Sequence, residues 1–155
     1  MTREHLLALL DQAYNRRSWH GTNLRGSIRG LTLAEAAWRP KRDRHNIWEV
    51  VVHAAYWKYA VWRRLTGSKR GSFPLEGSNW FPRPEVRTDA AWRRDTALLD
   101  RMHKELRAAV AGFPDEQFAV RAPGSALTYG ALVSGAAAHD LYHAGQIQLM
   151  KKIRS

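Results

Sequence analysis

The feature that most constrains the fold is a run from Ile47 to Thr66 that is apolar nearly all the way round a helix. Asn46 can cap the start of this run and Gly67 can end it. Valine, alanine and aromatic side chains recur on every face, and a helix with such a surface must be enclosed by other elements. The run therefore predicts a central helix that is buried more deeply than its neighbours.

Three further long helices are expected from apolar residues spaced by three and four. They cover residues 2–17, 88–112 and 128–153, and a short helix follows Thr32 and stops before Pro40. No stretch carries a persuasive strand pattern. Residues 68–87 form a connection that is too long for an antiparallel helix pair. The sequence predicts an all-α four-helix bundle with a long crossover between the second and third helices, which then run in the same direction.

The length of 155 residues suits a single domain over residues 1–155. The chain has no Cys, which excludes disulfides, thiolate metal ligands and a protein cysteine nucleophile. Its first residues lack the pattern of a secretory signal, and no apolar window is long enough to span a membrane. A cytoplasmic protein without membrane association is expected.

The charge balance is strongly basic, with 25 Lys and Arg against 14 Asp and Glu, or +11 with neutral His. This excess favours an anionic partner without choosing among nucleic acid, lipid and small molecules. The basic residues form small clusters spread along the chain rather than one recognition helix, so specific nucleic-acid binding is not expected and an anionic small-molecule substrate is favoured. A basic nucleic-acid-binding module with a structural His cluster remains the alternative.

The fourth helix carries polar residues where its core stripe should be. The stripe contains Leu132, Ala136, His139, His143, Gln146, Met150 and Ile153. His139 and His143 are four residues apart, so their rings lie on one face and can bind one metal ion. Such pairs also arise by chance, but burying unpartnered polar groups costs about 1–3 kcal/mol each, which favours a functional origin.

A third nitrogen donor is available from His53 on the central helix, if the second and fourth helices are neighbours. Three neutral His ligands leave positions open on Zn²⁺, Ni²⁺ or Fe²⁺, as in catalytic rather than structural sites. The pair is not the HExxH motif of zinc proteases, because Asp140 replaces the Glu. Asp140 is expected off the stripe, either as a hydrogen-bond partner behind the ligands or in a structural salt bridge.

Two segments make the chain resemble a known family. The fourth helix, LTYGALVSGAAAHDLYHAGQIQLMKK, and the second, HNIWEVVVHAAYWKYAVWRRL, are similar to the corresponding helices of the DinB-like (YfiT-like) superfamily, and the short LTLAEAAWRP element also matches. The resemblance covers nearly the whole chain. It implies a four-helix bundle that holds a divalent metal through His53, His139 and His143.

The resemblance also implies a reaction class. Relatives include transferases and isomerases that use bacillithiol, mycothiol or glutathione, and others are described as metal-dependent hydrolases. A low-molecular-weight-thiol S-transferase or a hydrolase is therefore expected, with a metal-bound thiolate or water as the nucleophile. Relatives often form homodimers, so a dimer is also expected.

Five further residues are candidates for the site. Glu49 shares the face of His53 and is the candidate general base, although it also suits the helix dipole. Gln146 is a candidate to bind substrate or a metal-bound water, or is a packing residue. Tyr56, Trp57 and Tyr142 are expected to wall a cofactor or substrate pocket, with core filling as the alternative.

Overall fold

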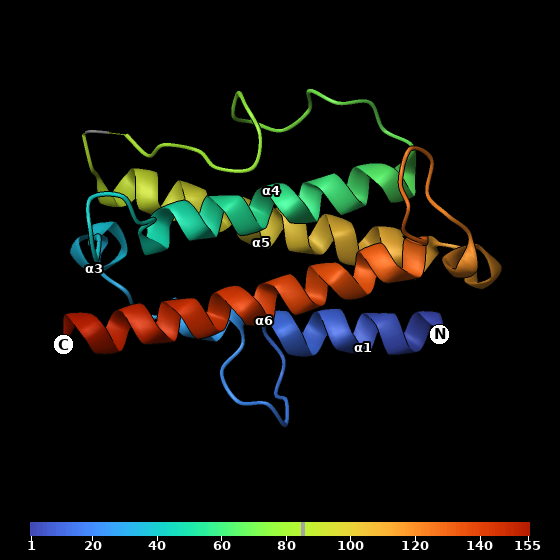
Figure 1. The fold of residues 1–155 in the computed structure, drawn as a ribbon, viewed down its shortest axis with the longest axis horizontal. Helices are drawn as coiled ribbons and strands as arrows, with labels where there is room; N and C mark the ends of the chain where they lie inside the picture. The colour runs from blue at the N-terminus through green and yellow to red at the C-terminus, as the bar shows by residue number, and fades with distance from the viewer. Residues whose placement is uncertain (85) are drawn as a thin grey trace.

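The computed structural model describes residues 1–84 and 86–155, and its regular elements are helices (Figure 1). They are α1 (Arg3–Tyr14), α2 (Leu24–Ser27), α3 (Leu33–Ala37), α4 (Ile47–Thr66), α5 (Asp89–Gly112), a 3-10 helix (Asp115–Ala119) and α6 (Tyr129–Arg154). Among the described residues the only β pairing is an isolated bridge between Arg121 and Thr128. The predicted all-α class is confirmed.

The helix ends follow local capping chemistry. The side chains of Thr2, Asn46, Thr88 and Thr128 each accept a hydrogen bond from a backbone amide in the first turn of their helix. At the other end of α4, Gly67 adopts the left-handed conformation with φ 68°. Asn46 and Gly67 are the caps that the sequence predicts for this helix.

Two local predictions differ from the structure. The first helix ends at Tyr14 rather than near Arg17, because the backbone at Asn15 leaves the helical region. The single-turn α2 and the 3-10 helix were not expected, since elements of four and five residues are too short to show a hydrophobic period.

The four long helices form a bundle in which α4 and α5 run in one direction and α1 and α6 run in the other (Figure 1). The connection between α4 and α5 returns along the outside of the bundle to the end where α4 begins. Most of the α4 residues are buried, as expected for the central helix, and α4 packs against both α5 and α6. This arrangement brings the His residues of α4 and α6 to one surface.

Asp95 of α5 is buried inside the bundle and is held there by polar contacts. Its carboxylate accepts a 2.6 Å hydrogen bond from the Trp48 indole and pairs with Arg83 of the crossover. A second buried pair, Lys58 on α4 with Asp140 on α6, joins these two helices.

In the described part of the chain, no helix combines the length and apolar character that a membrane span requires.

Candidate metal centre

The three predicted His side chains converge in the structure. His53 projects from α4, and His139 and His143 project from successive turns of α6. The Nε2 atom of His139 lies 3.1 Å from Nε2 of His53 and 3.0 Å from Nε2 of His143. Nitrogens that share one ion at ~2.1 Å are ~3.0–3.4 Å apart, so the observed spacing is close to that of a common metal ion.

Hydrogen bonds on the far side of two rings fix their tautomers. His53 donates from Nδ1 to the backbone carbonyl of Asn79 at 2.8 Å, and His143 donates from Nδ1 to Oε1 of Gln146 at 2.7 Å. Both rings therefore present an Nε2 lone pair toward His139. The single N–H of neutral His139 can donate to only one of these two lone pairs, whereas a cation can bind the lone pairs of all three rings.

The protonation states also suit a metal. Burial lowers the pKa of His139 to about 3 and that of His143 to about 4, and burial also lowers the pKa of His53. All three rings are therefore neutral near pH 7, which is the form that binds a metal. Neutral nitrogen donors suit Zn²⁺, Ni²⁺ and Fe²⁺, so the residues fit the group that the sequence predicts.

A cleft of about 580 Å³ opens onto the three His residues. The three rings, His45 and Gln146 contribute polar groups to its lining, and apolar surface comes from Val50, Trp80, Tyr142, Leu149, Met150 and Ile153. A largely apolar cleft with a few convergent polar groups is the usual form of a small-molecule site.

Trp80, from the crossover, organises one side of the cleft. Its ring stacks on His53 at 3.8 Å and on His45 at 3.6 Å, so the three rings form a sandwich. The neighbouring Asn79 holds both sides of the centre: its carbonyl accepts from His53, and its side chain accepts from the Trp57 indole at 3.0 Å. The crossover therefore supports the three-His cluster directly.

The structure brings Glu49 to a neighbouring hollow rather than into the cleft. Its carboxylate is bonded to Arg39, to the Asn46 amide in a capping box, and to Nδ1 of His45 at 2.9 Å. Burial alone would raise the pKa of Glu49, but its hydrogen bonds with Arg39 and His45 hold that pKa below its usual range. Glu49 thus reaches the cleft through His45.

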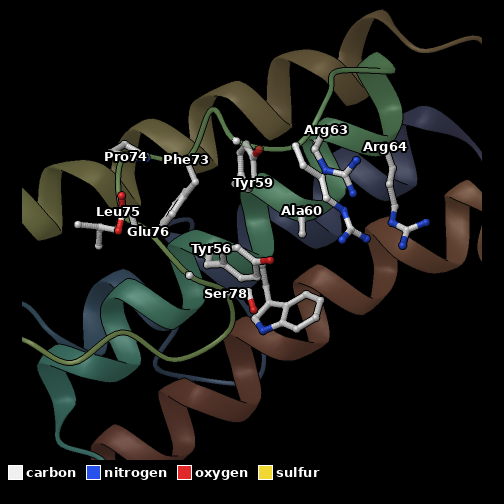
Figure 2. Close-up of a pocket in the computed structure, with 14 residues that line it drawn as sticks. Tyr56, Tyr59, Ala60, Arg63, Arg64, Phe73, Pro74, Leu75, Glu76 and Ser78 are labelled. Atoms are coloured by element: carbon white, nitrogen blue, oxygen red, sulfur yellow. The ribbon is translucent and has the colours of Figure 1, made fainter.

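The other candidates divide between two hollows. Gln146 and the exposed Tyr142 line the metal cleft. Tyr56 and Trp57 line a different cavity, formed by α4 and the crossover (Figure 2). The Trp57 ring still lies 6.4 Å from the rings of both His53 and His139, so Trp57 is adjacent to the cavity and to the centre.

Sequence reasoning missed His45, Asn79 and Trp80 as parts of the site. His45 had a signal, since it precedes the Asn46 cap and stands four residues before Glu49. Asn79 and Trp80 lie in an irregular segment, and no period predicts where such a segment folds back. Two roles were expected for Asp140, and the structure shows one of them, a salt bridge with Lys58.

The fold and the centre together define an all-helical bundle protein with a three-His cluster suited to a divalent metal. The family model of the DinB superfamily matches residues 15–147, and the chain belongs to that superfamily. Searches of curated proteins and of solved structures found no significant match.

Proposed function

We propose that this protein is a divalent-metal-dependent enzyme that acts as a low-molecular-weight-thiol S-transferase or as a hydrolase. The observation that carries the proposal is the convergence of three neutral imidazole Nε2 atoms from residues that line one cleft. A divalent ion held there would act as a Lewis acid and lower the pKa of a thiol or water to give a nucleophile near neutral pH.

The residues around the cleft have separate roles in this proposal. Gln146 and the Asn79 carbonyl orient the rings of His143 and His53. His45 lines the same cleft and would accept the proton from the nucleophile at Nε2, because its Nδ1–H is donated to Glu49. Glu49 is thus a positioning residue for His45. Arg39 and the Asn46 amide both donate hydrogen bonds to the Glu49 carboxylate and keep it ionised for this purpose.

The shape of the cleft favours a small substrate with an apolar part over nucleic acid. Tyr142, Leu149 and Ile153 leave apolar surface exposed beside the three His residues. That surface suits the carbon skeleton of an electrophile or ester, or the second subunit of a homodimer.

Two assays on metal-loaded protein test the reaction class. One follows conjugation of an aryl halide in the presence of glutathione, mycothiol or bacillithiol, and the other follows hydrolysis of p-nitrophenyl esters without thiol. His45→Gln should lower kcat by about tenfold or more while metal content is unchanged, as expected for loss of a general base. Glu49→Gln should shift the pH profile of the reaction. Absence of turnover in both assays by fully metal-loaded protein would contradict the proposal.

A further inference from the structure

A second cavity lies beyond Trp57 and has a different chemical character from the metal cleft. It has a volume of about 660 Å³ and is formed by the second half of α4 and the beginning of the crossover (Figure 2). We call it the arginine cavity, after Arg63, Arg64 and Arg70, which line it. Aromatic wall for the rest of the cavity is provided by Tyr56, Trp57 and Phe73.

Within the part of the chain that the structure describes, no acidic side chain is paired with these three arginines. Among the described residues, no carboxylate lies within 4.0 Å of Arg63, Arg64 or Arg70, whereas nine other arginines and one lysine do have such a partner. Glu76 is the one acidic residue among those that line the cavity. The cavity therefore carries a surplus of positive charge.

A structural role accounts for only part of this cluster. Arg63 and Arg64 lie in the last turn of α4, where cations are favoured by the helix dipole, and Arg64 donates to the Pro123 carbonyl at 3.3 Å. Arg70 lies outside the helix, past the Gly67 cap, yet it lines the same cavity. The same three arginines also line an adjoining hollow of about 410 Å³.

We propose that the arginine cavity binds a small organic dianion, either a phosphate monoester or a dicarboxylate. Guanidinium groups match the oxygens of phosphate and carboxylate in bidentate geometry, and several of them favour more than one negative charge. The aromatic wall takes the carbon skeleton, because Tyr56 and Phe73 present ring surface to the same space. Trp57 lines this cavity and its ring lies 6.4 Å from the rings of His53 and His139, so the ligand would lie beside the three-His centre.

Calorimetric titration of the full-length, metal-free protein with phenyl phosphate and with phthalate tests this proposal. Both probes have an aromatic body, so the comparison distinguishes a phosphate ligand from a dicarboxylate, and neutral phenol is the control for the charge. The titrations use 0.15 M NaCl at pH 8, where long-range attraction to a basic protein is screened. Because no metal is present, the outcome is independent of the proposed enzymatic function.

The double variant Arg63→Ala with Arg70→Ala should weaken binding of the preferred dianion by about tenfold or more, as expected for loss of charge-assisted hydrogen bonds. The matched control is Arg17→Ala with Arg93→Ala, which removes the same charge from exposed positions outside the cavity and should change affinity by less than about twofold. If the first variant does not fold, as checked by circular dichroism, Arg70→Gln alone removes an exposed side chain and should still weaken binding several-fold.

Three results would overturn the proposal. They are no binding of either dianion at millimolar concentration, binding of phenol as tight as that of the dianions, and equal weakening in the cavity and control variants. Binding of one dianion and not the other supports the proposal and assigns the ligand class.

Discussion

At the scale of single residues, the orientation of His53 depends on a residue outside the helices. Asn79 is the one non-glycine among the described residues with a positive φ, at 67°. That conformation points its carbonyl at Nδ1 of His53, and its side chain bonds Trp57. Asparagine tolerates the left-handed region better than most residues, so the backbone and the side chain both contribute to positioning.

Asn79→Val should weaken metal binding by about tenfold or more, since a β-branched residue disfavours positive φ and moves the carbonyl away from His53. Asn79→Gly is the matched control, because it retains the conformation and the carbonyl and removes only the contact with Trp57. Competition against a fluorescent chelator measures both affinities. Equal affinities of the two variants would show that the Asn79 carbonyl does not hold the ring.

The residue scale also shows what spacing can predict. His139 and His143 were identifiable because steps of four place side chains on one helix face. His53 required the further assumption that the second and fourth helices are neighbours, which the structure confirms. His45 joins the site by stacking on Trp80, and that contact depends on the path of the crossover rather than on any local pattern.

At the scale of elements, α4 shows how strongly local chemistry fixes helix limits. The predicted bounds, with Asn46 and Gly67 as caps, are those of the structure. The end of α1 was less predictable, because Arg16 and Arg17 are compatible with a helix and only the backbone at Asn15 shows that it stops.

The cap at Gly67 provides a stability test. A Cβ at Gly67 meets no atom within 4 Å, so Gly67→Ala introduces only the strain of positive φ and should cost about 1 kcal/mol of unfolding free energy. Gly135 also has free space around it but lies inside α6, where Gly135→Ala should stabilise by about 0.5–1 kcal/mol. Urea denaturation of both variants measures whether each substitution lowers or raises the free energy of unfolding. Stabilisation by Gly67→Ala would contradict the assigned cap.

The contact between α4 and α6 depends on the buried pair Lys58 and Asp140, each with a side chain 1% exposed. Lys58→Met leaves the carboxylate without its partner and should cost about 3–5 kcal/mol. Adding Asp140→Leu should recover most of that loss, because the unpaired charge is then removed. Equilibrium denaturation of the single and double variants gives both values, and a double variant no more stable than Lys58→Met would count against the pair.

At the scale of the whole molecule, the crossover is what makes a site out of the bundle. It allows α4 and α5 to run in one direction (Figure 1). Its residues also line two hollows beside α4. One hollow is the metal cleft and the other is the arginine cavity. The length of residues 68–87 predicted a crossover, but the loop contacts that shape both hollows depend on packing between distant segments.

The stability of the whole fold should depend on pH through His103, which lies buried against Lys58 and Tyr14. Burial lowers its pKa from 6.5 to about 3, and the Lys58 charge acts in the same direction. Between these pH values the unfolded chain binds a proton at His103 that the folded chain does not, so stability falls as the pH falls.

In His103→Asn this difference in proton binding is absent. The unfolding free energy of the metal-free variant should therefore decline less steeply from pH 6.5 to 4, by about 1.4 kcal/mol per pH unit relative to wild type. Urea denaturation at several pH values, with chelator in every sample, compares the slopes. Parallel curves for the two proteins would show that His103 is not a buried neutral group.

The most direct test of the central claim is metal content by mass spectrometry, on untagged protein purified without chelating resin. Wild type, after reconstitution with Zn²⁺ or Ni²⁺ if needed, should hold close to one ion per chain, and His53→Ala, His139→Ala and His143→Ala should each lose most of it. Asn79→Gly serves as a folded control that keeps its metal. A wild type that stays empty after reconstitution, or His variants that bind as much metal as wild type, would contradict the three-His centre.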